Sequence, residues 1–230
     1  MNEKELSVER KIYNAQQKFL TGVYGWMAIA LAISAATAFY TSTNLALLRM
    51  LFSGMGYLAL IIGEIALVWW LSASIRRISL QTAIIGFIAY SVLNGLNLSA
   101  IFLVYTGSSI ASVFITTAAM FGAMCLYGLT TKSNLNSAGK YLMMGLIGVV
   151  IASLLNMFIR SDGMNWLISV ATVVIFTGLT AYDSQKMLAV SQRADGSEMF
   201  QKAAIIGALE LYLDFINMFL ALLRLFGRRK

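Results

Sequence analysis

The chain has 230 residues, of which 59% are hydrophobic and only 12% are charged, with a mean hydropathy of +0.77 and a formal net charge of +7. Soluble domains are about 45–50% apolar and about 25% charged, so a soluble fold could not cover this much apolar surface. The composition therefore indicates an integral membrane protein. In such proteins basic residues usually lie in cytoplasmic loops and set the topology, so the positive charge does not indicate a nucleic-acid partner.

The residue types that are missing or rare exclude several kinds of site. The chain has no histidine, which removes serine–histidine and cysteine–histidine catalysis, histidine metal sites and histidine pH switches. Cys125 is the only cysteine, so the chain can form neither an internal disulfide nor a thiolate cluster. We therefore do not expect an enzyme.

Along the chain, residues 1–18 come first and are polar and of mixed charge, and we expect them to form a cytoplasmic tail rather than a cleavable signal peptide. Seven apolar segments follow, each close to the ~20 residues that cross ~30 Å of hydrocarbon. They are Phe19–Tyr40, Met55–Ser74, Thr82–Tyr105, Ile110–Leu129, Tyr141–Ile159, Met164–Met187 and Ala203–Phe226. Because backbone polar groups find no water in lipid, each segment should be an α-helix. The sequence thus predicts an all-α integral membrane protein in which residues 19–230 form a single seven-helix transmembrane domain.

Lysine and arginine residues outside these segments predict the orientation. Eleven lie on one side: Lys4, Arg10, Lys11, Lys18, Arg76, Arg77, Lys132, Lys140, Lys186, Arg193 and Lys202. Between the segments, the other side has only Arg49 and Arg160, so the positive-inside rule places the N-terminus in the cytoplasm. The C-terminal tail "RLFGRRK" breaks this pattern if all seven segments cross. Segment seven is therefore either re-entrant or a full span that departs from the rule.

Two patterns in the apolar segments predict contacts between helices. Three alanines in the first segment are spaced four residues apart and suit close helix packing: Ala28, Ala32 and Ala36. In the third segment, Ser91, Asn94 and Asn97 are spaced three residues apart. This row could line a pore, but we favour hydrogen bonds between helices.

Four carboxylates lie inside the predicted segments: Glu64, Asp183, Glu210 and Asp214. A charged side chain at mid-bilayer costs roughly 2.5–3.5 kcal/mol, so such residues indicate an ion or proton pathway by default. In segment seven, Glu210, Asp214 and Asn217 share one helical stripe with Arg224. A helix with this stripe must face protein or water, which predicts a central position for segment seven. Each of these residues also has a purely structural alternative. The stripe could form a ladder of ion pairs, Asp183 could lie at the membrane interface, and Glu64 could make a single hydrogen bond to another helix.

Two carboxyl groups that meet in a low-dielectric bundle cannot both ionise cheaply, and the pair can share one proton. In a chain without histidine, such a pair is the remaining candidate for a pH sensor. Carboxylate oxygens are also hard ligands that suit Ca²⁺, although protons or Na⁺ would use the same groups. The residues therefore predict a proton-gated cation path and leave the ion open.

The motifs "FTGLTAYDSQKM" and "LELYLDFINMFLALLRLFG" resemble the last two helices of the Bax inhibitor-1 (transmembrane Bax inhibitor motif) family, and the layout of all seven segments is similar. The short polar N-terminus and compact loops resemble a bacterial member, which implies the bacterial inner membrane. The resemblance implies six helices around a central seventh and a pH-sensitive Ca²⁺ leak. Members of this family raise the same question of whether segment seven spans or folds back, and we favour a full span with the basic tail as a local exception.

The roles of the family's functional residues are assigned here to the positions of this chain that match the family's motifs. The resemblance implies that Asp183 and Asp214 form the hydrogen-bonded pair that senses pH, and it makes them candidate Ca²⁺ ligands. In the family, a basic residue at the end of the second helix is thought to hold the aspartate pair in the closed state, and we call it the latch; here it corresponds to Arg76 or Arg77. Glu64 matches a glutamate of the second helix that lies near the ion path. Loss of the shared proton would then let segments two and seven move apart.

Two other functions are alternatives to the leak. Some bacterial relatives modulate a membrane-anchored ATP-dependent protease, and others in the family act in stress responses, which would use residues 1–18 for recognition. An intramembrane aspartyl protease also uses two aspartates on neighbouring helices, but the glycine-rich contexts typical of those enzymes are missing here. The leak remains the leading hypothesis, and the regulatory partner is the alternative.

Overall fold

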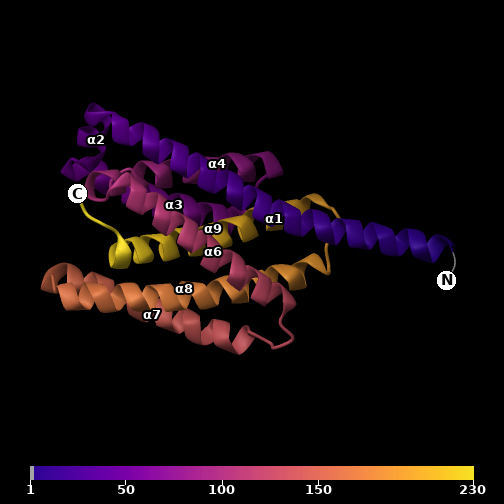
Figure 1. The fold of residues 1–230 in the computed structure, drawn as a ribbon. Coiled ribbons are helices and arrows are strands. Elements are labelled where there is room, and N and C mark those ends of the chain that lie inside the picture. The colour runs from indigo at the N-terminus through magenta and orange to yellow at the C-terminus, as the bar shows by residue number, and fades with distance from the viewer. Residues whose placement is uncertain (1–2) are drawn as a thin grey trace. The chain divides into compact units, whose positions relative to one another are not determined.

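The computed structural model describes the backbone of residues 3–230 and the side chains of residues 13–230. These residues contain nine helices (Figure 1): α1 Glu3–Thr43, α2 Leu45–Phe52, α3 Gly54–Ser74, α4 Leu80–Leu98, α5 Ile101–Val104, α6 Gly107–Thr130, α7 Asn136–Ile159, α8 Asp162–Ser191 and α9 Glu198–Phe226. Seven spans are long and apolar enough to cross a membrane, formed by α1, α3, α4 with α5, α6, α7, α8 and α9. The predicted all-α membrane fold is confirmed.

Two helices begin where a polar side chain satisfies free backbone N–H groups. Asn44 Oδ1 accepts hydrogen bonds from the N–H groups of Ala46 and Leu47 at the start of α2, and Ser79 Oγ accepts one from Thr82 N at the start of α4. At the N-terminus, α1 already begins at Glu3, so most of the predicted tail is helical. Residues 1–2 of that tail lie outside the described part of the chain.

The chain divides into two compact units. Unit 1 comprises Met1–Val104 with Ala189–Tyr212, and unit 2 comprises Tyr105–Leu188 with Leu213–Lys230. Helix α9 contributes its first half to unit 1 and its second half to unit 2. It is also the most enclosed span, with 72% of its most apolar window buried against 6–39% for the other six. This enclosure agrees with the central seventh helix that the sequence predicts.

In unit 1, α1 packs along α4, and α3 packs on the same helix (Figure 1). The closest approach is at Gly95, where an added Cβ would lie only 2.7 Å from the carbonyl oxygen of Ser34 in α1. The predicted packing stripe of α1 is wrong, because its three alanines are all exposed: Ala28, Ala32 and Ala36. The buried face carries Ser34, Ala38 and Thr41 instead. The glycine on α4, rather than the alanines on α1, decides where the two backbones meet.

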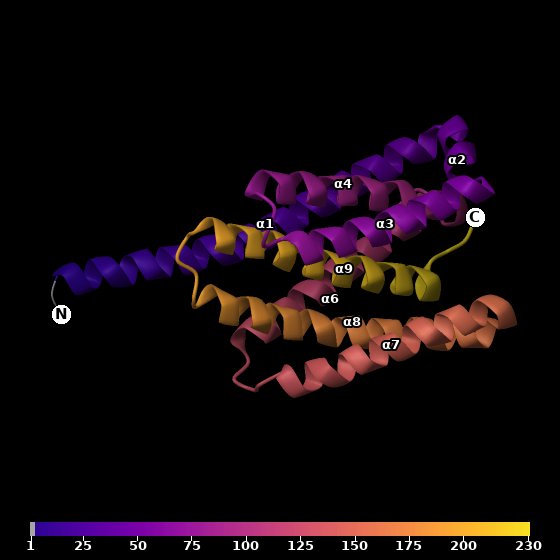
Figure 2. The same ribbon diagram turned by 180° about the vertical axis from the view of Figure 1, so that it is seen from behind.

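In unit 2, α8 lies between α6 and α7, and Figure 2 shows α7 and α8 side by side. A Cβ on Gly128 of α6 would collide with the carbonyl oxygen of Ala181 in α8, so only glycine permits this contact. The second half of α9 packs on α6 through aromatic rings, with Phe114 and Phe215 centroids 5.2 Å apart and Phe121 and Phe215 centroids 5.5 Å apart.

Contacts at the two ends of unit 2 orient its helices. Gln185, near the end of α8, donates its Nε2 to Ser133 O in the turn after α6, so this part of α8 lies beside the end of α6. The chain after α9 lies at the opposite end, where Thr106 N at the start of α6 donates to Arg228 O and Arg228 N donates to Ser109 Oγ. The helix is unbroken over 29 residues, which is about 43 Å long. An unbroken helix of this length is long enough to cross a bilayer and shows no reversal of the chain within α9.

Candidate functional site: acidic residues in the spans

Asp214 lies in the middle of α9 and is 4% exposed. The ring of the next residue, Phe215, packs on Phe114 and Phe121 of α6. Asn217, which the sequence places on the same stripe, donates its Nδ2 to Leu213 O of its own helix at 2.8 Å. The buried carboxylate is therefore the central polar group of this half of α9.

Asp183 lies on the buried face of α8, because Leu179 and Met187, one turn before and after it, are 3% and 4% exposed. Its Oδ1 lies 3.9 Å from Nζ of Lys186, and the Asp183 side chain is 13% exposed. Gln185, two residues later, reaches the turn after α6. Asp183 therefore lies near the end of unit 2, and its ion pair with Lys186 agrees with the interfacial alternative.

The register of α8 against α9 puts the two aspartates at one depth. The helices are antiparallel, because Arg224 near the end of α9 lines the same cavity as Asp162, the first residue of α8. Thr177 Oγ1 of α8 lies 4.0 Å from Met218 Sδ of α9. Asp183 follows Thr177 by six residues and Asp214 precedes Met218 by four, so their levels differ by two residues, or about 3 Å at 1.5 Å per residue. Contact between the two carboxyl groups stays a prediction.

The predicted latch residues Arg76 and Arg77 are exposed in the turn after α3. This turn is tied to the start of α9, because Lys202 Nζ donates to Ile78 O at 3.0 Å and lies 3.7 Å from Glu198 Oε1. Both arginines belong to unit 1, whereas both aspartates belong to unit 2. The latch therefore stays a prediction.

Glu64 belongs to a second buried polar cluster, in unit 1. Its Oε2 accepts a hydrogen bond from Asn97 Nδ2 at 3.2 Å, while its Oε1 is buried without a hydrogen-bond partner among residues 13–230. The inter-helix hydrogen bond predicted as the structural alternative for Glu64 is thus present. Glu210 is half-buried on α9 and belongs to the same unit.

The core of this cluster is a chain of hydrogen bonds that joins α1, α4 and α9. The hydroxyls of Ser34 and Tyr212 lie 2.6 Å apart, Ser34 Oγ donates to Ser91 O at 2.7 Å, and Tyr212 OH donates to Asn94 Oδ1 at 3.0 Å. All four residues are at most 8% exposed. Of the predicted row, Asn94 and Asn97 make the expected side-chain hydrogen bonds between helices, whereas Ser91 Oγ donates to Phe87 O of its own helix. Sequence reasoning missed Ser34 and Tyr212, although a tyrosine between the acidic residues of segment seven was a usable signal.

Metal ligation was predicted for Asp183 and Asp214. Within residues 3–230, no three histidine, cysteine, aspartate or glutamate residues gather in a way that could hold a metal ion. Ca²⁺ takes six to eight oxygen ligands, so a site at these two aspartates would need backbone carbonyls or water to complete it. The two aspartates therefore stay candidate Ca²⁺ ligands.

A family model and several known proteins match most of the chain. The family model described as "Inhibitor of apoptosis-promoting Bax1" matches residues 16–230. The chain is 46% identical over 217 residues to inner membrane protein YbhL of Escherichia coli strain K12, covering 93% of each chain. It is 45% identical over 228 residues to an uncharacterized protein of Borreliella burgdorferi, covering 98% of each, and 38% identical over 215 residues to one of Rickettsia prowazekii, covering 93% of this chain and 91% of the relative.

Proposed function

Because the chain belongs to the Bax inhibitor-1 family of membrane proteins, we propose that it forms a pH-sensitive path through which Ca²⁺ leaks across the inner membrane. One of the relatives is named an inner membrane protein, which supports that location for this chain. The N-terminus faces the cytoplasm in this proposal, because the eleven basic residues outside the spans on its side then lie inside.

One observation supports the proposal most: the half-buried Asp183 and the buried Asp214 lie on the antiparallel helices α8 and α9 at levels that differ by about 3 Å along the helix axes. At low pH the pair shares a proton and the path is closed. At higher pH the proton is lost, and two carboxylates in the contact we propose, taken as about 4 Å apart, would repel by roughly 4 kcal/mol at an effective dielectric constant of 20. A free-energy difference of this size changes a closed-to-open ratio by about three orders of magnitude.

The test is Ca²⁺ flux into proteoliposomes that contain the purified full chain, measured between pH 5 and pH 8. Asp214→Asn should abolish the pH dependence, because the amide does not titrate. Asp195→Asn is the matched control, since Asp195 is exposed between α8 and α9 and bonds its near neighbour Ser197, whose N–H donates to Asp195 Oδ1. Hydrogen bonds from the Ser197 side chain and backbone hold the pKa of Asp195 below its usual value, so this carboxylate stays ionised throughout the assay. Wild-type pH dependence in Asp214→Asn would contradict the proposed gate.

The alternative is a regulator that binds a membrane-anchored ATP-dependent protease or another stress-response protein. It is favoured by the helical extension of α1 from Glu3, ahead of the apolar span that begins at Tyr13. Deletion of residues 1–12 separates the two functions. A leak should keep its flux after this deletion, whereas a regulator that uses the extension should lose its effect on the protease. Measuring both in one preparation shows which function depends on the extension.

A further inference from the structure

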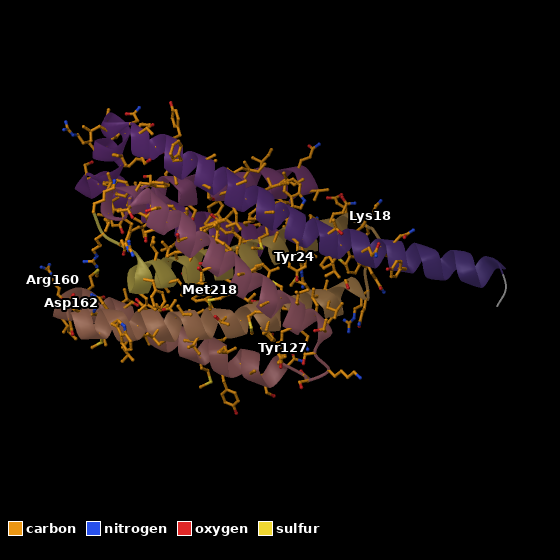
Figure 3. All side chains as sticks on the ribbon, viewed as in Figure 1. Lys18, Tyr24, Tyr127, Arg160, Asp162 and Met218 are labelled. Atoms are coloured by element: carbon orange, nitrogen blue, oxygen red, sulfur yellow. The ribbon has the colours of Figure 1, made fainter. Side chains whose placement is uncertain are left out.

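A polar cavity of about 410 Å³ lies where the turn between α7 and α8 meets the end of α9, entirely within unit 2. Two arginines line it, Arg160 from the turn and Arg224 from α9, together with Asn156, Asn165 and Asp162. Figure 3 shows Arg160 and Asp162 close together at this turn. None of these groups takes part in the proposed gate.

The backbone at Arg160 is held in an unfavourable conformation. Arg160 has φ 57° and ψ 37°, and it is the only non-glycine residue with positive φ in residues 3–230. This left-handed region disfavours side chains with a Cβ, while glycine adopts it at no steric cost. An arginine at a position that suits glycine points to a role for its side chain.

A buried asparagine locks this turn. Asn156 is 4% exposed. Its backbone carbonyl oxygen accepts a hydrogen bond from Arg160 N at 2.7 Å, and its side-chain Oδ1 accepts one from Ser161 N at 3.0 Å. Its Nδ2 donates to Asn165 Oδ1 at 2.7 Å and to Ser161 O at 3.2 Å. The cavity wall is therefore rigid and preformed.

The two arginines of the cavity lack acidic partners. Neither lies within 4.0 Å of a carboxylate oxygen among residues 13–230, and Arg224 makes one hydrogen bond, from Nε to Leu220 O. With Asp162 counted, the three charged side chains sum to +1. Two guanidinium groups with free donors match the geometry of a phosphate group.

The cavity lies at the end of the protein that topology predicts to be poor in basic residues. Nevertheless Arg160 and Arg224 are joined there by Arg228, whose backbone is fixed to the start of α6. An apolar rim adjoins the lining residues in the chain: Met157, which lines the cavity, is 63% exposed, and Phe158 and Phe226, each within two residues of a lining residue, are 80% and 70% exposed. In a membrane protein, exposed apolar side chains face lipid. A ligand that enters the cavity beside them would therefore itself have apolar acyl chains.

We propose that this cavity binds the phosphate of an anionic phospholipid in the leaflet opposite the basic loops. Arg160 and Arg224 hold the phosphate oxygens, the apolar rim contacts the acyl chains, and the bound headgroup neutralises the basic C-terminal end. This binding explains why the tail "RLFGRRK" departs from the positive-inside rule.

The test is a lipid titration of the full chain in nonionic detergent, followed by the midpoint of thermal unfolding. Phosphatidylglycerol should raise the midpoint, because it binds the folded state, whereas phosphatidylcholine and inorganic phosphate should not. Arg160→Gly should weaken phosphatidylglycerol binding about tenfold or more, as expected when a charge-assisted hydrogen bond is lost. Since glycine suits the backbone at this position, the lipid-free variant should unfold no earlier than wild type, which separates lost binding from lost folding.

A second variant and a control complete the design. Arg224→Gln should weaken binding in the same way, while Arg49→Gln removes an exposed arginine from the same predicted side and should respond like wild type. An equal response to phosphatidylcholine would overturn the proposal, and so would a full response in Arg160→Gly. A response to inorganic phosphate alone would reduce the cavity to a soluble-anion site and overturn the lipid assignment.

Discussion

Substituting Gly95 by alanine should separate α1 from α4 and weaken the polar cluster of unit 1. A Cβ at this position would lie 2.7 Å from both Ser34 O and Thr37 Cβ, and 3.0 Å from Ser34 Cα. Non-bonded carbon atoms prefer about 3.5–4.0 Å, so the helices must move apart by about 1 Å. Two of the three atoms belong to the backbone, and no side-chain rotation relieves the contact.

The magnitude follows from three effects. Overpacking a close contact costs about 1–3 kcal/mol, and weakening the hydrogen bond between Ser34 and Tyr212 costs roughly 1 kcal/mol more. Replacing a glycine inside a helix by alanine returns about 0.5–1 kcal/mol. Gly95→Ala should therefore lower the free energy of unfolding by about 2 kcal/mol, the sum of these effects.

The assay is reversible unfolding in detergent by a denaturant series, with near-ultraviolet circular dichroism to report the environment of Tyr212. Gly25→Ala in α1 is the matched control, because no heavy atom lies within 4 Å of its added Cβ. The control should be as stable as wild type or slightly more stable. If Gly95→Ala unfolds at the same denaturant concentration as Gly25→Ala, the argument from the close approach of α1 and α4 is refuted.

Two further substitutions probe the same unit. Tyr212→Phe removes the hydroxyl that links Ser34 to Asn94 and leaves buried polar groups unsatisfied. It should lower the free energy of unfolding by about 1–3 kcal/mol in the same denaturant series. An unchanged unfolding midpoint would mean that these hydrogen bonds make no net contribution to stability. Glu64→Gln keeps an acceptor for Asn97 and removes a partly buried charge, so the free energy of unfolding should stay the same or rise slightly. The same substitution should lower Ca²⁺ flux in proteoliposomes. Wild-type flux in that variant would remove Glu64 from the candidate ion path.

The sequence by itself determined the class of protein and the number of spans. Seven apolar stretches near the length of a bilayer leave the backbone no alternative to helices, which is why the predicted segments agree with the helices of the structure. The polar row of α4 was also readable, because amides inside lipid need partners on other helices, and Asn94 and Asn97 have them.

Only the tertiary structure decided which helix faces meet. The spans are apolar on nearly every face, since lipid accepts the same side chains as a protein core does, so periodicity did not distinguish the buried face of α1 from the exposed one that carries Ala32. The contact of Gly95 with Ser34, the bond from Ser34 to Tyr212 and the shared depth of the two aspartates all depend on the register between helices. That register is set by atoms on both partners at once, and residues far apart in the sequence acquire it only when the helices pack.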